Sequence, residues 1–279
     1  MHRFELAYGK GKTVLQVEDA HYLGVLKSKL VNYRTEKSGS ELVQDALEHP
    51  IGSPRLKDIA EKKQKIVVIS SDHTRPVPSR VIMPLILKEI RLGNPKADIT
   101  ILIATGLHRP TSKEELREKY GDKIFRNEKI VVHNCDDDEN LVNIGSLPSG
   151  GKLIINKLAV DADLLLAEGF IEPHFFAGFS GGRKSVLPGI ASRDTVMYNH
   201  NARFIASKYA RAGVIENNPI HSDMLYAARA ARLDFIVNVV IDSNHNPIFA
   251  VAGDCDLAHR VGCDFLSGQC DLCRYCGCN

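Results

Sequence analysis

The fold is decided by the stretch IVVISSDHTRPVPS, residues 66–79, together with the helical pattern that follows it over residues 80–91. Its first four residues, 66–69, are aliphatic and β-branched without interruption, which predicts a strand buried on both faces of a parallel sheet. The polar remainder predicts a loop, and Gly93 and Pro95 act as stop signals for the helix. A strand, a loop and a helix in this order form the repeating unit of an α/β protein.

The same unit recurs along the chain. Residues 99–104 predict a second strand, and Thr111 opens a capping box with Glu114 for the next helix. Residues 164–167 predict a third strand. Later elements are expected as a helix over residues 222–231 and strands over residues 235–241 and 248–251. The pattern predicts a Rossmann-like parallel sheet with helices on both faces, whose loops bind ligands at the carboxyl edge.

The composition narrows the classes of function. The 279 residues are 44% hydrophobic and 25% charged, enough for a substantial core, and the net charge of +2 lacks the basic footprint of a nucleic-acid-binding protein. The chain opens without an apolar signal segment, and no apolar run approaches the ~20 residues that span a bilayer. We therefore expect a cytoplasmic protein that binds neither nucleic acid nor a membrane.

The loops after the first two strands carry polar chemistry. In residues 70–79, hydroxyls, a guanidinium and a helix N-terminus suit a phosphate or carboxylate, unless Asp72 and Arg75 merely pair with each other. The second loop, TGLHRPT at residues 105–111, places His108 directly after its strand. An imidazole titrates near neutrality and suits proton transfer, although a lone loop histidine is more often a hydrogen-bonding or surface residue.

The third loop, residues 168–185, has the most unusual composition. Aromatic residues surround His174, and the run Gly-Gly-Arg-Lys at residues 181–184 lets the backbone approach a ligand closely as Lys184 enters a helix. Packing of the phenylalanines explains the aromatic residues but not that run. A phosphate-loop-like phosphotransferase is the alternative hypothesis. It ranks second because a phosphate loop for nucleotides needs glycine where Arg183 stands.

Another imidazole follows at His200, close to the helix after the third loop. Taken alone, it is more often a structural residue. Together with His108 and His174 it becomes a candidate metal ligand, because imidazole suits nickel, copper, zinc or iron.

Three segments taken together resemble a known family. They are DHTRPVPS, TGLHRPT and GFIEPHFFAGFSGGRKSVLPG, and in this order they closely resemble the nickel-dependent lactate racemase family. The resemblance covers roughly residues 65–200, and the flanks from residue 1 to about residue 266 are compatible with it. Long joint agreement is more specific than any single loop. It implies a racemase or epimerase of small 2-hydroxy acids, served by proteins that make its cofactor.

The cofactor that the resemblance implies is a nickel pincer nucleotide, a nicotinate-derived bis-thiocarboxylate mononucleotide. By similarity, Lys184 holds this cofactor covalently and His200 supplies the protein-derived nickel ligand. Carbon and sulfur donors with one imidazole are a sensible square-planar set for nickel.

The resemblance also implies roles for the first two loops. His108 and His174 form the acid/base pair, one for each substrate orientation, while the cofactor takes a hydride. Arg75 engages the substrate carboxylate. The turn that binds the nucleotide consists of Asp72, His73, Thr74 and Arg75.

The end of the chain departs from the family pattern. We expect an N-terminal cofactor-binding catalytic domain over residues 1–266 and a cysteine-rich tail over residues 267–279. The cysteine spacing suits a zinc or iron–sulfur site, but truncation or a frameshift explains the loss of pattern better. Family members carry a second domain that closes over the site. Without it, an inactive cofactor-binding module is a further alternative.

Overall fold

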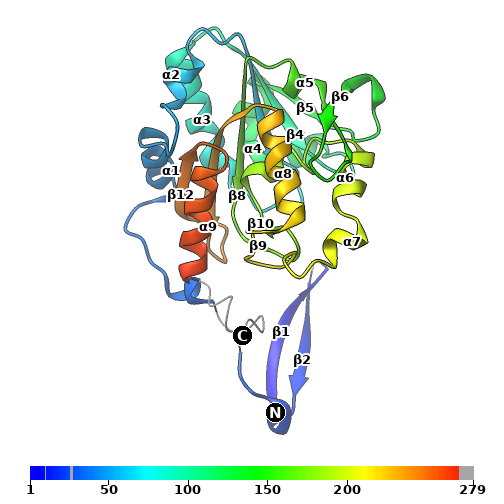
Figure 1. The fold of residues 1–279 in the computed structure, drawn as a ribbon. Coiled ribbons are helices and arrows are strands. Elements are labelled where there is room, and N and C mark those ends of the chain that lie inside the picture. Colours follow the sequence, from blue (N-terminus) through cyan, green and yellow to red (C-terminus); the bar gives the residue numbers. More distant parts are fainter. Residues whose placement is uncertain (10, 26–27, 270–279) are drawn as a thin grey trace.

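The computed structural model describes residues 1–9, 11–25 and 28–269 and is built around a six-stranded sheet with helices on both faces (Figure 1). The strands, in spatial order, are β12 (Pro247–Gly253), β11 (Leu233–Ile241), β8 (Leu164–Phe170), β3 (Lys65–Ser71), β4 (Asp98–Ala104) and β5 (Lys129–Val132). Neighbours from β11 to β5 are parallel, which confirms the predicted α/β class.

The edge strand β12 runs antiparallel to β11, which the strand pattern does not distinguish. A tight turn joins them. The amide of Asp242 donates to Asn246 O at 3.0 Å, and the Asp242 carboxylate accepts the amides of Asn244 and Asn246 at 2.8 and 2.9 Å. A connection this short returns the chain in the opposite direction, because parallel neighbours need a crossover of roughly a dozen or more residues.

The helices divide between the two faces of the sheet. One face is covered by α1 (Gly39–Glu48), α2 (Leu56–Ala60), α3 (Ser79–Gly93) and α4 (Lys113–Asn127). The other face is covered by α5 (Lys157–Val160), α6 (Arg193–Asn199), α7 (Ala202–Ile205), α8 (Pro219–Ala230) and α9 (Leu257–Gln269). Side chains of β3 point alternately to the two faces of the sheet. Val67 and Ile69 pack on the face covered by α5 to α9, and Ile66 and Val68 pack on the face covered by α1 to α4.

The predicted helices form, with ends that differ from the sequence signals. Helix α3 covers the predicted segment 80–91. The capping box of α4 pairs Ser112 with Glu115, so the predicted box of Thr111 and Glu114 is wrong by one residue. The reason is tertiary, since the Thr111 hydroxyl is engaged by the first polar loop instead.

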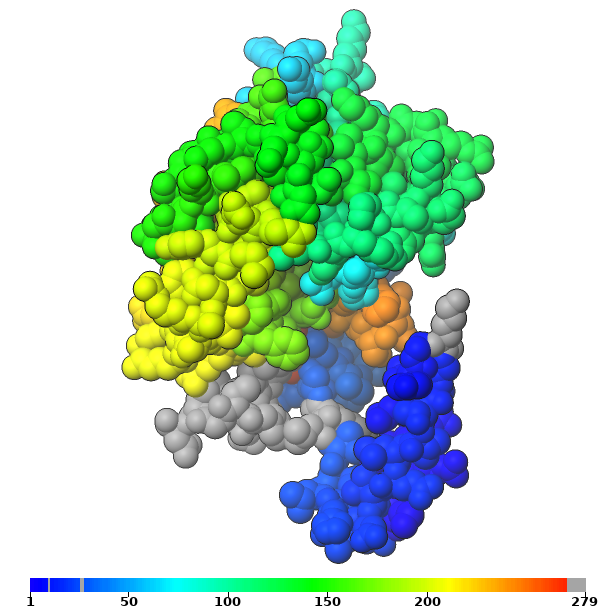
Figure 2. Space-filling view, turned by 90° about the vertical axis from the view of Figure 1, so that its right-hand side faces the viewer, coloured from blue at the N-terminus to red at the C-terminus, as the bar shows by residue number. Residues whose placement is uncertain are grey.

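Shorter elements complete the described chain. Antiparallel pairs are formed by β1 (His2–Tyr8) with β2 (Gly11–Val17), by β6 (Leu141–Ser146) with β7 (Lys152–Asn156), and by β9 (Pro173–His174) with β10 (Gly178–Phe179). The 3-10 turns are η1 (Asp19–His21), η2 (Lys29–Asn32), η3 (Asp138–Asn140) and η4 (Gly182–Ser185). The β1–β2 hairpin extends away from the sheet (Figures 1 and 2), and the sequence patterns do not predict it.

The last described element bears on the predicted domain boundary. Helix α9 runs to Gln269 and so continues through residue 267, where the cysteine-rich tail is predicted to begin. The cysteines from residue 270 onward lie outside the described residues. Within the described ranges, no helix combines the length and apolar character needed to cross a membrane.

Gly93, the last residue of α3, is expected to tolerate no side chain. A Cβ atom there would lie 1.9 Å from the carbonyl oxygen of Lys57, a backbone atom of α2. We expect Gly93→Ala to lower the free energy of unfolding by about 1–3 kcal/mol or more, as overpacking does. Urea denaturation measures this, with Gly268→Ala as control, because no described atom lies within 4 Å of a Cβ at that position in α9. Equal midpoints for the two variants would contradict the close contact.

Candidate active site

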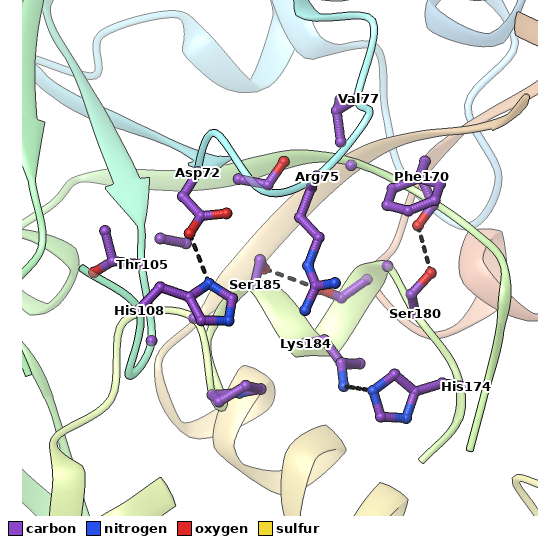
Figure 3. Close-up of a pocket in the computed structure, with 18 of the residues that line it drawn as sticks. Asp72, Arg75, Val77, Thr105, His108, Phe170, His174, Ser180, Lys184 and Ser185 are labelled. Atoms are coloured by element: carbon purple, nitrogen blue, oxygen red, sulfur yellow. Dashed lines mark hydrogen bonds and ion pairs between the residues drawn. The ribbon is translucent and has the colours of Figure 1, made fainter. Parts of the chain in front are cut away.

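The chemically rich loops meet at the carboxyl edge of the sheet. From β3 the chain moves outward to β4 and β5, and it then returns to β8 on the other side of β3. The crevice at such a switch point is the usual ligand site of an open α/β sheet. A cavity of about 320 Å³ lies here, lined by the loops after β3, β4 and β8 and by residues of η4 and α6 (Figure 3).

Most of the residues that the sequence singles out reach this cavity. Those in its lining are Asp72, Arg75, His108, His174, Lys184 and His200. They come from three loops and from the end of α6, so the sheet topology brings them together rather than proximity in sequence. Phe176 and Val196 add apolar surface to the same wall.

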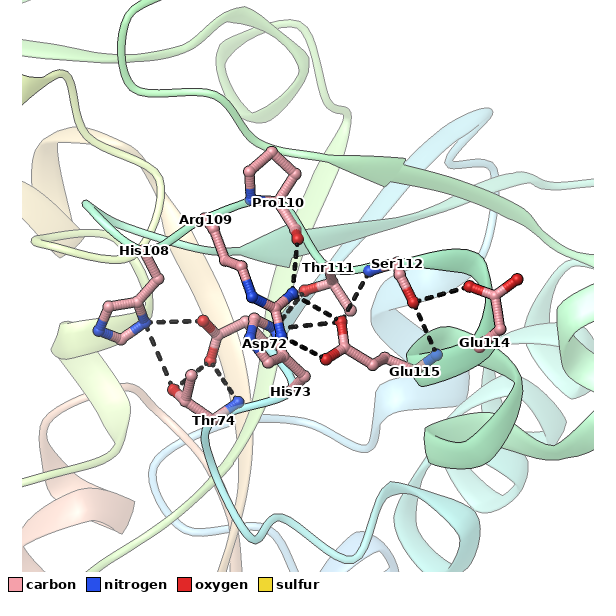
Figure 4. Close-up of polar contacts among 10 residues, drawn as sticks. All are labelled: Asp72, His73, Thr74, His108, Arg109, Pro110, Thr111, Ser112, Glu114 and Glu115. Carbon is pink, nitrogen blue, oxygen red and sulfur yellow. Dashed lines mark hydrogen bonds and ion pairs between the residues drawn. The ribbon is translucent and has the colours of Figure 1, made fainter. Parts of the chain in front are cut away.

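His73 and Thr74 are not among the lining residues. His73 Nδ1 lies 3.1 Å from Thr111 Oγ1 and 3.7 Å from a carboxylate oxygen of Glu115, so this ring ties the first loop to the start of α4 (Figure 4). Thr74 donates its amide and its hydroxyl to Asp72 Oδ1, at 3.2 and 2.7 Å. In this structure both side chains hold the first loop in shape.

The buried carboxylate of Asp72 pairs with His108. Its Oδ2 atom lies 2.7 Å from His108 Nδ1, and Asp72 is only 1% exposed. Because carboxylate oxygens accept hydrogen bonds, this contact places the ring proton on Nδ1 and leaves Nε2 toward the cavity (Figure 3). The Arg75 guanidinium points into the cavity and has no ion pair among the described residues. An internal pair of Asp72 and Arg75, the alternative considered for this loop, is therefore wrong.

The amine of Lys184 and the ring of His174 form another side of the cavity. Lys184 Nζ lies 3.0 Å from His174 Nε2 and over the ring of Phe176. Burial lowers the pKa of Lys184 to about 7, aided by the charges of Arg183 and Arg75. Burial and the Lys184 charge lower the pKa of His174 to about 3. At neutral pH this ring is therefore uncharged. Its Nδ1 atom accepts the amide of Ala177 at 3.3 Å, so the ring proton lies on Nε2 and faces the Lys184 amine.

His200, which caps the end of α6, presents an uncharged imidazole to the same space. Its ring packs edge-on against Phe176 with centroids 5.1 Å apart, and burial lowers its pKa to about 4. Its Nδ1 atom is buried and has no hydrogen-bond partner in the described part of the chain. Such an imidazole suits a transition metal. The described residues contain no group of three or more His, Cys, Asp or Glu side chains that could hold a metal ion.

Two buried polar residues of the strands also shape the site, and the sequence patterns assign them no role. Asn238, 1% exposed in β11, accepts the amide of Gly182 at 2.7 Å and so ties η4 to the sheet. Glu168, 2% exposed in β8, accepts the hydroxyls of Ser70 and Ser79 at 2.5 Å. A single polar residue in an apolar strand is the available signal, because such a group is buried with a hydrogen-bond partner.

Lys184 is expected to react with acetic anhydride at neutral pH. Only the uncharged amine reacts, so labelling should rise with pH around a midpoint near the pKa of about 7. Lysines in water have a pKa of ~10.4, so the uncharged fraction at pH 7 is roughly a thousandfold larger for Lys184 than for an exposed lysine. Peptide mass spectrometry after trace labelling measures the midpoint, with the pooled exposed lysines as the internal reference. A Lys184 midpoint equal to that of the pool would contradict the burial of the amine.

Comparisons with known proteins place these features in one family. A family described as "Lactate racemase N-terminal domain" matches residues 8–213. The lactate racemase of Thermoanaerobacterium thermosaccharolyticum is 56% identical over 267 residues, which are 96% of this chain and 63% of that protein. The lactate racemase of Lactiplantibacillus plantarum is 54% identical over 266 residues, 95% of this chain and 63% of that protein. This chain thus spans 63% of the length of these curated relatives.

Solved structures agree with this fold. The lactate racemase apoprotein from Thermoanaerobacterium thermosaccharolyticum superposes with a TM-score of 0.88 and 55% identity, covering 96% of this chain and 63% of that one. A protein from Thermotoga maritima superposes with a TM-score of 0.63 and 22% identity, covering 82% of this chain and 58% of that one. At that identity the second likeness concerns the fold alone.

Proposed function

Because this chain belongs to the lactate racemase family, whose N-terminal domain it matches over residues 8–213, we propose that it binds a nickel pincer nucleotide and racemises a small 2-hydroxy acid. One observation supports this above the others: an amine and three imidazoles border a single cavity. These groups belong to Lys184, His108, His174 and His200. We further propose that the protein works in the cytoplasm and receives its cofactor from the proteins that make it.

The residues around the cavity suit the proposed cofactor. The amine of Lys184, half uncharged at its pKa of about 7 and more so above it, is a nucleophile fit for covalent attachment. His200 offers one imidazole donor for nickel, and the soft donors of the cofactor complete the set. Asp72 and Arg75 border the cavity, and we assign the turn from residue 72 to 75 to the nucleotide. When bound, the cofactor supplies a hydride acceptor.

His108 and His174 are placed to move the proton of a substrate hydroxyl. Asp72 holds His108 with Nε2 toward the cavity, and His174 is uncharged at neutral pH. Nε2 of His174 lies 3.0 Å from the Lys184 amine, so a cofactor held by that amine would lie next to this ring. Each ring would serve one enantiomer, taking its hydroxyl proton when that enantiomer is the substrate and supplying the proton when it is the product.

Arg75 is the residue that we assign to the substrate carboxylate. Its guanidinium borders the cavity and forms no ion pair within the described ranges. The planar fork of arginine suits two parallel hydrogen bonds to a carboxylate. Held in this way, a 2-hydroxy acid presents its hydroxyl to a space bordered by two imidazoles.

Two alternatives differ in what they require of the chain. A phosphate-loop phosphotransferase is disfavoured, because Arg183 is buried where that loop has glycine and η4 is a 3-10 turn rather than the start of an α-helix. A module that holds the cofactor without catalysis is the second candidate. It requires the binding residues Lys184 and His200 but not the acid/base pair.

The test is co-expression of this chain with the cofactor-making proteins. We expect an intact mass increased by one cofactor, a modified peptide containing Lys184, bound nickel by elemental analysis, and conversion of L-lactate to the D form by chiral chromatography. The full-length Lactiplantibacillus plantarum lactate racemase is the positive control for loading. An unmodified chain beside a loaded control overturns the proposal, and a loaded chain without conversion supports the non-catalytic module.

A further inference from the structure

Arg183 precedes Lys184 in the chain and has no part in the function proposed above. Its side chain is 0% exposed, and burial lowers its pKa only to about 10, so it stays charged at neutral pH. None of its described hydrogen bonds involves a carboxylate. The Asp256 carboxylate acts on this charge without a hydrogen bond to it. A buried charge without a bonded carboxylate is costly, so a physical reason for this arginine is needed.

The guanidinium holds the loop in front of Lys184 by its carbonyl oxygens. It donates to Ala177 O at 2.7 Å, to Gly181 O at 3.2 Å and to Ser180 O at 3.4 Å. The planar fork of an arginine reaches several acceptors at once, whereas a lysine ammonium is a compact point charge. The loop that connects His174 to Lys184 is therefore fastened from within.

Two uncharged imidazoles contact the other edge of the guanidinium. Arg183 Nε donates to His221 Nδ1 of α8 at 3.0 Å, and an Nη atom lies 3.0 Å from His259 Nε2 of α9. Burial lowers the pKa of His221 to about 3 and lowers that of His259 well below its usual value. Both rings are therefore uncharged at neutral pH and add no second positive charge next to Arg183.

The backbone beside Arg183 is pressed against one of these imidazoles. Gly182 has a φ of +52°, and a Cβ atom there would lie 2.8 Å from the His259 ring. The same residue donates its amide to Asn238. The loop is thus held by α9 and by β11 as well as by the guanidinium, which leaves Lys184 little freedom of position.

The positive charge of Arg183 acts on the amine of Lys184. Among the cations that lower the pKa of Lys184, Arg183 acts more strongly than Arg75, and Glu172 acts in the opposite direction. A positive charge nearby favours the uncharged form of an amine. The other titratable groups near the amine are the uncharged rings of His174 and His200.

We propose that Arg183 is a positioning residue for Lys184: its guanidinium fastens the loop that ends at Lys184 and keeps a positive charge beside the amine. The fastening fixes where the amine lies, and the charge favours the form that reacts. This inference rests on the proposed function only for the use to which the amine is put. Position and reactivity are both measured in the cofactor-free protein, so failure here leaves the proposed function standing.

The test compares Arg183→Gln, Arg183→Lys and Arg75→Gln in the full chain. For each, the pH midpoint of Lys184 acetylation is measured with hydrogen–deuterium exchange of residues 177–184. Arg183→Gln removes the charge, so the midpoint should move to higher pH and labelling at pH 7 should fall about five-fold. Arg183→Lys keeps the charge without the fork, so the midpoint should stay while exchange rises. Arg75→Gln should move the midpoint and leave the exchange unchanged.

An Arg183→Gln midpoint equal to that of the unmodified chain overturns the proposal, because an arginine with a purely structural role alters exchange alone. Should circular dichroism show that Arg183→Gln is unfolded, Arg183→Lys decides the matter. Faster exchange of residues 177–184 in an otherwise native Arg183→Lys protein supports the proposal, and unchanged exchange overturns it.

Discussion

Replacing Asp72 with asparagine is expected to slow the proposed racemisation by about 10²–10⁴-fold, the range that a positioned general base contributes. The Asp72 carboxylate accepts from His108 Nδ1 at 2.7 Å, which leaves Nε2 as the acceptor on the cavity side. An asparagine turns a donor or a weaker acceptor toward Nδ1, so the ring adopts the other tautomer or turns away. Chiral chromatography of lactate, on protein loaded to equal nickel content, measures the rate.

The double variant separates positioning from cofactor binding. If Asp72 acts through His108, the Asp72→Asn/His108→Gln protein should be no slower than His108→Gln alone, because groups that act as a unit are not additive. Losses that multiply in the double variant would mean that Asp72 serves the reaction by another route. Equal nickel content in all variants is the control, since a loading defect lowers the rate for an unrelated reason.

Replacing Lys184 with methionine is expected to abolish covalent attachment of the cofactor and to reduce racemisation by more than about 10³-fold. Lys184 is the single lysine in the cavity lining among the described residues, so no other described lysine of the lining offers an amine for attachment. Methionine keeps the length and apolar contact of the side chain against Phe176. Intact mass and nickel analysis after co-expression with the cofactor-making proteins provide the measurement.

A second substitution tests whether charge alone retains the cofactor. Lys184→Arg keeps a cation at the cavity wall but supplies no amine that becomes uncharged near neutral pH. We expect this variant to lack the mass adduct as well. A cofactor adduct on either variant, mapped to another residue, would show that attachment does not depend on Lys184.

The strand pattern predicts the central sheet well because a strand buried on both faces of a parallel sheet consists of a continuous apolar run. Residues 66–69, 99–104 and 164–167 all lie in strands, and the predicted helix over residues 80–91 lies within α3. The antiparallel direction of β12 was not predicted, since direction depends on the length of a turn and not on the composition of the strand.

The amino-acid sequence by itself determined which segments reach the carboxyl edge of the sheet, because strand order and chain direction place every loop that follows a strand there. Only the tertiary structure decided the partners within that edge. It pairs Asp72 with His108 and not with Arg75, sets the Lys184 amine against His174, and turns His73 away from the cavity. Such choices depend on burial and on acceptors supplied by distant elements, which a local stretch of sequence does not contain.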